Sequence, residues 1–262
     1  MRIRALLAHI ARRILVHNNA SRDFIRQQVD VPDADARIIL LPHPSYAGLY
    51  EPEGVAEAAL RSRVDAPSEK FVLGFGSIRK QKGFDAMIDA LDPTFTAKHG
   101  LRLRISGDGA EGPLLRKAYG ERTDVDWDLA YVPMDDVPAL FRAASCVMLP
   151  YTRLLTSGVA LLSLTVGGVI VAPALPTFVE LLPEPLRRFL YKPDDPADLR
   201  RVVADVAGLT PEQDRDYRLL GMESVKAVHP ALISSALGAI YRGLAVPKVQ
   251  ALDSVAVLPN LG

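Results

Sequence analysis

Residues 145–172 read SCVMLPYTRLLTSGVALLSLTVGGVIVA, and this stretch determines the expected fold. Residues 145–149 are a short apolar run, which is typical of a buried strand. A more polar loop follows, and residues 158–166 begin after Thr156 and Ser157, as a capped helix does. Residues 169–172 are a second short apolar run. A strand, a helix and a strand in this order predict a βαβ unit with parallel strands.

The same alternation extends over most of the chain. Several strands are continuous apolar runs, as expected when helices cover both faces of a parallel sheet. We therefore predict an α/β fold with a doubly wound, Rossmann-like parallel sheet and terminal helices. Ser21 is the expected N-cap of the first of these helices. Further strands are expected at 13–17, 37–41, 71–76, 101–107 and within 125–132, and further helices at 22–29, 84–91, 111–119, 137–144 and 198–206.

Composition excludes some functions. Lys plus Arg and Asp plus Glu both number 31, so the net charge is zero, which argues against a dedicated nucleic-acid binder. The single cysteine, Cys146, excludes a disulfide within the chain and a cysteine-based metal site, and its apolar neighbours predict a buried thiol. A lone cysteine also favours a reducing compartment, so we expect a cytoplasmic protein, with the inner face of the membrane as the alternative.

No apolar stretch is long enough to span a bilayer. Residues 1–13 are short, basic and amphipathic, which indicates a helix that packs on its own protein. Contact with a membrane surface is the alternative for this segment. Residues 246–262, with two prolines and a terminal glycine, predict an extended tail.

Ligands of open α/β sheets bind where the carboxyl ends of the strands meet, so three loops are candidate sites. The first, residues 74–83, reads GFGSIRKQKG, and its glycines allow a close approach to a ligand. Arg79 and Lys82 are spaced so that both face one phosphate group, next to an expected helix start that also favours an anion. The alternative is a solvated basic loop.

The second and third loops give signals of the same kind, and each of the three is weak by itself. Residues 105–109 read ISGDG, where a tight turn is expected and Asp108 is the predicted cap of the next helix. A turn without a ligand is the alternative. In the third loop, Thr156, Ser157 and the amides at Gly158 predict a phosphate cradle, to which Arg153 adds donors. An ordinary serine or threonine N-cap is the alternative here.

In their order and spacing, the loops resemble a known family. Residues 74–83 resemble the G-R-x-x-x-K-G segment, and residues 105–109 the V-G-D-G strand end, of retaining, metal-independent GT-B glycosyltransferases (glycosyl transferases group 1). Residues 131–144 are similar to their V-x-x-x-D-L-x-x-L-Y-x-x-A-D stretch. Residues 149–172 resemble L-P-S-x-x-E-G-F-G-x-x-x-x-E-A-M-A-x-G-x-P-V-V-A, and Glu180 fits the glutamate that follows.

The resemblance implies a nucleotide-sugar donor and no metal or other cofactor. It implies that Arg79 and Lys82 neutralise the diphosphate leaving group, which is an electrostatic catalytic role. It also implies that the Gly158 end of the helix faces the diphosphate, and that Tyr131 and Val132 lie where the base binds. The implied donor-binding set is Gly76, Ser77, Gly107, Asp108, Tyr131, Val132, Arg153, Thr156, Ser157, Gly158 and Ser163.

The sequence departs from the family at two glutamates, whose positions are taken by Leu155 and Ser163. The first glutamate normally contacts the donor sugar or phosphates, and the second normally binds the ribose hydroxyls. Ser163 offers one neutral hydrogen bond in place of a charged pair. The Thr-Ser-Gly pattern resembles a subgroup variant, so we favour altered donor contacts over inactivity.

The resemblance also implies a domain arrangement. Residues 1–13 match only the last helix of an N-terminal domain, residues 14–210 the nucleotide-sugar-binding domain, and residues 211–245 the closing helices. We expect a hexosyltransferase acting on a glycan, a lipid-linked sugar or a small acceptor, with a separate N-terminal-domain protein or a second copy as partner. The alternatives are a non-catalytic nucleotide-sugar-binding or partner-binding module and a fragment of a longer enzyme. His43 is either a donor contact or a structural loop residue.

Overall fold

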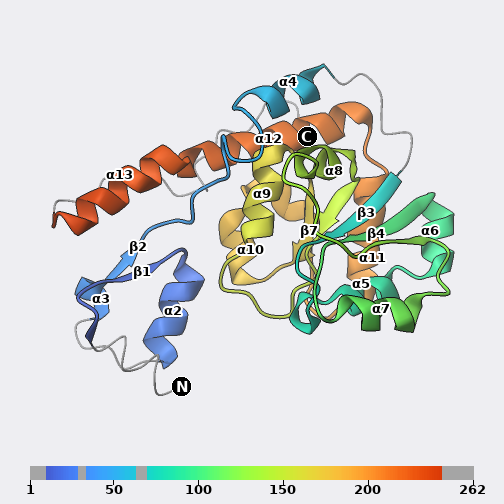
Figure 1. Ribbon diagram of the computed structural model, residues 1–262, viewed down its shortest axis with the longest axis horizontal. Coiled ribbons are helices and arrows are strands. Elements are labelled where there is room, and N and C mark those ends of the chain that lie inside the picture. Colours follow the sequence, from blue (N-terminus) through green and yellow to red (C-terminus); the bar gives the residue numbers. More distant parts are fainter. Residues whose placement is uncertain (1–9, 29–33, 63–69, 244–262) are drawn as a thin grey trace.

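The computed structural model describes residues 10–28, 34–62 and 70–243, and its centre is a six-stranded parallel sheet (Figure 1). In sheet order the strands are β5 (Val125–Asp128), β4 (Leu101–Ser106), β3 (Lys70–Phe75), β6 (Cys146–Met148), β7 (Ile170–Pro173) and β8 (Leu190–Tyr191). The chain builds β3, β4 and β5 towards one edge and then returns to β6, β7 and β8 on the other side. This confirms the doubly wound α/β fold, in which ligands bind where the strand order reverses.

Helices cover both faces of this sheet (Figure 1). One face carries α5 (Phe84–Ala90), α6 (Pro93–His99) and α11 (Pro196–Ala207). The other carries α8 (Val137–Ala143), α9 (Gly158–Val166) and α12 (Pro211–Ser224). Two further helices and three short turns complete the domain: α7 (Gly112–Tyr119), α10 (Pro176–Leu181), η1 (Lys80–Lys82), η2 (Glu184–Phe189) and η3 (Val225–Val228).

The central strands are apolar because both of their faces are covered. Every residue of β6 and β7 is buried, as a parallel sheet between two helical layers requires. Cys146 is the predicted buried thiol, and its burial raises the pKa of the thiol to about 12. In α12 the buried Arg218 donates to the carbonyls of Gly167 and Ala144, at the ends of α9 and α8. These bonds tie α12 to both helices.

The first two strands form a sheet of their own. Strands β1 (Ile14–Val16) and β2 (Ile38–Leu40) pair in parallel with each other and not with the six-stranded sheet. With α2 (Asn19–Gln28) and α3 (Ala34–Arg37) they make a small unit beside the main domain, which we call the β1–β2 unit (Figure 1). The predicted domain of residues 14–210 therefore contains two separate sheets.

The predicted cap of the first helix is wrong. Helix α2 begins at Asn19, and the Asn18 side chain accepts a hydrogen bond from the Ser21 amide at 2.7 Å. Asparagine is among the strongest N-cap residues, so Asn18 starts the helix before Ser21 is reached.

The expected closing helices are present as α12, η3 and α13 (Pro230–Tyr241), and α13 extends beyond the sheet above the β1–β2 unit (Figure 1). Between β2 and β3 the chain forms α4 (Val55–Arg61), which packs on α12. Most of the helix expected at residues 1–13, and all of the tail at 246–262, lie outside the described residues. Among the helices that are described, none has the length and apolar character needed to cross a membrane.

Candidate functional site

The first two predicted loops touch backbone to backbone at the carboxyl edge of the sheet. The amide of Gly76 donates to the carbonyl of Ser106 at 3.0 Å, and the amide of Ile78 donates to the carbonyl of Asp108 at 2.7 Å. A Cβ on Gly107 would lie 2.2 Å from the carbonyl oxygen of Gly76, and Gly107 has a φ of +139°. Only glycine fits this approach, so the glycines fix the loops against each other.

The third loop joins them from the other side. A Cβ on Gly83 would lie 2.1 Å from the carbonyl oxygen of Pro150, and a Cβ on Gly76 would lie 3.6 Å from Cγ2 of Val159. The third loop therefore contacts the first loop at two places, after the turn η1 and at the start of α9, at the carboxyl edge of the sheet. The structure brings together the three loops that the sequence singled out.

Asp108 does not cap the following helix, contrary to the prediction. Helix α7 begins at Gly112, and its N-cap residue Glu111 makes no side-chain capping bond. Asp108 instead uses its backbone carbonyl to hold Ile78, and its side chain is exposed. The turn through Gly109 and Ala110 separates Asp108 from the helix, which is why the carboxylate does not reach the helix amides.

The two basic residues of the first loop differ in environment. The Lys82 ammonium donates to the hydroxyl of Tyr151 at 3.0 Å and lies 4.2 Å from the centre of that ring. Arg79 is exposed, and its Nε donates to Oγ of Ser77 at 3.1 Å. The amide of Lys82 donates to the carbonyl of Arg79 at 2.9 Å, so both residues belong to one tight turn. Lys82 is thus the less exposed of the two cations, and both of its side-chain contacts are to Tyr151.

The start of α9 has a conventional cap. Oγ of Ser157 accepts a hydrogen bond from the amide of Ala160 at 3.1 Å, so this hydroxyl serves the helix, as the N-cap alternative predicts. Within the described chain no acceptor is found for the amides of Gly158 and Val159. These two N–H groups remain available to an anion. Thr156 and Arg153 are exposed beside them.

Ser163 does not reach the site. It is fully buried in α9, and its Oγ has no hydrogen-bond partner among the described residues. A Cβ on Gly168 would lie 2.5 Å from this oxygen, so the hydroxyl points at the turn after the helix. This burial contradicts the predicted contact with a ribose. Leu155, at the other glutamate position, is exposed.

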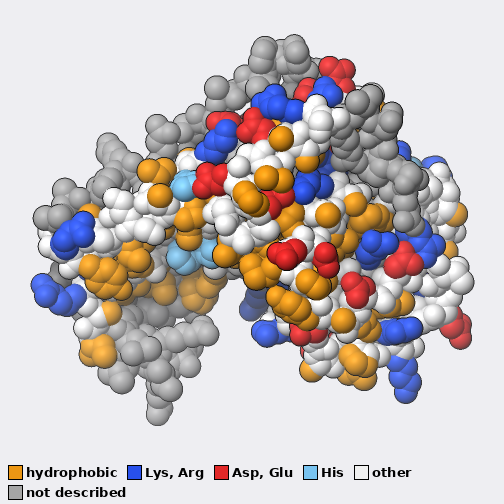
Figure 2. Space-filling model, turned by 45° about the horizontal axis from the view of Figure 1, so that its top comes forward, with side chains coloured by type: hydrophobic (Ala, Val, Ile, Leu, Met, Phe, Trp, Pro, Cys, Tyr) orange, Lys and Arg blue, Asp and Glu red, His pale blue; other side chains and the backbone are white. Residues whose placement is uncertain are grey.

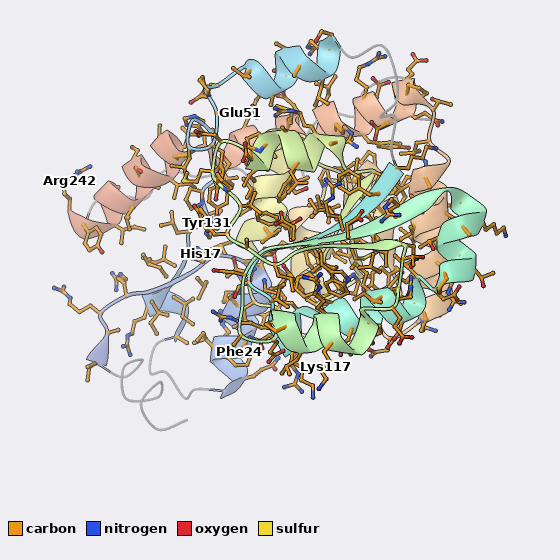
Figure 3. The ribbon with its side chains drawn as sticks, turned by 45° about the vertical axis from the view of Figure 1, so that its right-hand side comes forward. His17, Phe24, Glu51, Lys117, Tyr131 and Arg242 are labelled. Atoms are coloured by element: carbon orange, nitrogen blue, oxygen red, sulfur yellow. The ribbon has the colours of Figure 1, made fainter. Side chains whose placement is uncertain are left out.

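The predicted base-binding residues follow β5. Tyr131 is 69% exposed and Val132 is half-buried. In Figure 3 Tyr131 lies on the side of the sheet domain that faces the β1–β2 unit. The structure therefore leaves Tyr131 open to a ligand at this edge.

Two tyrosines near the site were not predicted. Tyr46 follows β2, and a Cβ on Gly158 would lie 2.7 Å from its hydroxyl. Burial is the main cause of the raised pKa values of Tyr46 and Tyr50, and the Tyr50 phenol also interacts with that of Tyr131. The loop after β2 carries no motif, so only the fold reveals that the Tyr46 ring reaches the start of α9 and that Tyr50 packs against Tyr46. His43 packs against Tyr46 with ring centres 5.9 Å apart and bonds the Pro44 carbonyl, contacts that fit the structural alternative.

The β1–β2 unit is anchored to the third loop. Both carboxylate oxygens of Glu180, in α10, accept from the amide of Asn19 at 2.9 Å, and one also accepts from its side chain at 2.6 Å. The Asn18 side chain donates to the carbonyl of Leu155 at 2.5 Å. A carboxylate at the first amides of α2 is favoured by the helix dipole. Glu180 therefore holds the small unit beside the site.

We expect Glu180→Ala to lower the free energy of unfolding by about 1–2 kcal/mol, because it removes a charged cap from α2. Thermal unfolding measures the loss, and limited proteolysis locates it. Glu184→Ala is the matched control, since Glu184 is exposed at the start of η2. Equal unfolding temperatures for the two variants would show that Glu180 does not anchor the unit.

A doubly wound parallel sheet with glycine-lined loops and a basic turn at its carboxyl edge defines a Rossmann-like domain. The particular family follows from the sequence comparison. Residues 69–207, just over half of the chain, match the model of the glycosyl transferases group 1 family. The chain belongs to this family. No curated protein sequence matches the chain significantly.

Solved GT-B glycosyltransferases share the fold. Sucrose-phosphate synthase from Thermosynechococcus elongatus is 19% identical with a TM-score of 0.73, over 92% of this chain and 60% of that one. Anabaena HepE, in complex with UDP and glucose, is 18% identical with a TM-score of 0.71, over 93% and 66%. WaaG, a glycosyltransferase involved in lipopolysaccharide biosynthesis, is 16% identical with a TM-score of 0.66, over 87% and 62%. The chain thus spans less than two thirds of each of these proteins.

Proposed function

We propose that this chain binds a nucleotide diphosphate sugar and takes part in transferring its hexosyl group to a glycan, a lipid-linked sugar or a small acceptor. Membership of the glycosyl transferases group 1 family supports the reaction class. The observation that carries the proposal is the ordered Lys82 ammonium, which lies on a loop in contact with the start of α9. HepE, a protein of the same fold, holds UDP and glucose.

The reaction breaks the bond between the anomeric carbon and the diphosphate and forms a bond from that carbon to an acceptor oxygen, which loses its proton. Negative charge grows on the diphosphate as it leaves. Lys82, Arg79 and the free amides at Gly158 and Val159 stabilise this charge. By resemblance to the family, the proposed transfer is metal-independent and retaining.

A second α/β domain forms the other wall of the site in this proposal. It is supplied by the same polypeptide, by a separate protein or by a second copy. Hydrophobic side chains are visible on the part of the molecule that carries α13 and the β1–β2 unit (Figure 2), and exposed ones include Leu15, Leu40, Leu232 and Tyr241. An isolated two-stranded sheet is marginal in water, so these residues favour a covering domain. A cytoplasmic location is part of the proposal.

The second candidate function is a non-catalytic module that binds a nucleotide sugar or a partner protein. The residues at the two family glutamate positions favour this second function. Leu155 has no polar side chain, and Ser163 is buried, so neither supplies the contact that a glutamate makes. Binding without transfer is the result that separates this function from the first.

A ligand screen tests the proposal. UDP-, GDP- and ADP-sugars are titrated into the protein by calorimetry, and each binder is then assayed for transfer with neighbouring gene products present. We expect one nucleotide sugar to bind, and we expect the matching nucleoside diphosphate to compete with it for the site. If no nucleotide sugar binds, both the transferase and the nucleotide-sugar-binding module are contradicted.

A further inference from the structure

The Lys82 side chain is held by a single buried residue. Tyr151 is 3% exposed, and its hydroxyl accepts from the Lys82 ammonium at 3.0 Å while its ring lies 4.2 Å from the same nitrogen. A hydrogen bond and a cation–π contact from one tyrosine together restrict a long, flexible side chain.

Tyr151 is itself fixed from two sides. Its ring packs against Phe178 with centres 6.2 Å apart, and its amide donates to the carbonyl of Leu149 at 2.8 Å. The carbonyl of the preceding residue, Pro150, is in close contact with Gly83, the residue after Lys82. Tyr151 therefore packs against Phe178 and lies directly beside the turn that carries Lys82.

The pair retains unused hydrogen-bond donors. A lysine ammonium has three N–H groups, and only one of them is used by Tyr151. The other two N–H groups of Lys82 are thus available to the oxygens of one anion.

We propose that Tyr151 is a positioning residue that holds Lys82 for the diphosphate of the donor. This inference rests on the proposed function. By restricting Lys82 before the ligand arrives, Tyr151 reduces the conformational entropy that binding would otherwise cost. The effect of Tyr151 on diphosphate binding therefore acts through Lys82.

A double-mutant cycle tests this dependence. The affinity for the nucleoside diphosphate that binds best among UDP, GDP and ADP is measured by calorimetry for wild type, Tyr151→Phe, Lys82→Ala and the double variant. Tyr151→Phe keeps the ring and removes only the hydroxyl, and we expect it to weaken binding about three- to tenfold. In the Lys82→Ala background the same change should not alter the affinity, because the ammonium that Tyr151 positions is absent.

Tyr217→Phe is the matched control. Tyr217 is also buried, accepts a hydrogen bond from a cation, Arg188, and packs against a phenylalanine, Phe189. It lies in α12, away from the three loops. We expect Tyr217→Phe to leave the affinity unchanged, and thermal unfolding of every variant shows that the fold is kept.

The outcomes separate the two proposals. An equal loss of affinity from Tyr151→Phe in both backgrounds would overturn the positioning role while leaving diphosphate binding intact. No loss in either background would overturn it as well. If wild type binds none of the three diphosphates, the proposed function itself fails and the role of Tyr151 fails with it.

Discussion

Lys82→Ala is expected to weaken binding of the nucleoside diphosphate at least tenfold. The change removes the ordered cation of the site, and a tenfold loss corresponds to about 1.4 kcal/mol. A hydrogen bond to a charged group contributes about 1.5–3 kcal/mol, so the loss of one such bond to phosphate is enough to account for a tenfold weaker affinity. The affinity is measured by calorimetry at a fixed ionic strength, because surface electrostatics depend on salt.

Lys80→Ala is the control for this prediction. Lys80 lies in the same turn, η1, and its side chain is exposed, so the two variants lose the same charge from neighbouring positions. A general effect of positive charge would weaken binding equally in both variants. Equal affinity of wild type and Lys82→Ala would show that Lys82 does not bind the diphosphate.

Gly107→Ala is expected to cause the largest loss of stability among the variants considered. The new Cβ would lie 2.2 Å from the Gly76 carbonyl oxygen, in a backbone conformation with a φ of +139°. Strain of this kind costs about 1–3 kcal/mol, and an atom forced into a packed contact costs a similar amount. We expect a total loss of about 3–5 kcal/mol, together with loss of diphosphate binding, since the two loops must move apart.

Gly100→Ala separates the two causes of that loss. Gly100 has a φ of +60°, but a Cβ there would have no neighbour within 4 Å. We therefore expect a cost of about 1 kcal/mol from the backbone conformation alone. Urea unfolding of both variants gives the comparison. If the two variants were equally stable, close packing of the first two loops would not be what requires glycine at 107.

The sequence predicted the main sheet well because apolar runs and glycine-terminated strands carry that information locally. Helix α9 was predicted with its bounds, since Ser157 is a cap signal that acts over three residues. Helix α6 was missed, although Asp92 and Pro93 are a cap and a first-turn proline of the usual kind. It is no shorter than α5 and α8, which were predicted, but Phe95 is its one large apolar residue, so the apolar spacing typical of a helix is absent.

Contacts between distant segments were not predictable in the same way. The three apolar residues of β1 look the same whether they join the main sheet or a separate one, so the β1–β2 unit was not foreseen. Tyr46 and Gly158 are far apart in sequence, and no motif links them. Ser163 was assigned by alignment with a glutamate, but a shorter side chain at that helix position stays buried.

The central claim is that the three loops bind a diphosphate, and titration calorimetry of wild type in the presence of EDTA tests it directly. The protein is titrated with a nucleotide diphosphate sugar, the matching nucleoside diphosphate and the matching nucleoside. We predict that the first two bind with similar affinity and that the nucleoside binds at least tenfold more weakly, because the phosphates make the charged contacts. Equal binding of nucleoside and diphosphate, or no binding of either phosphate-containing ligand, would contradict this account.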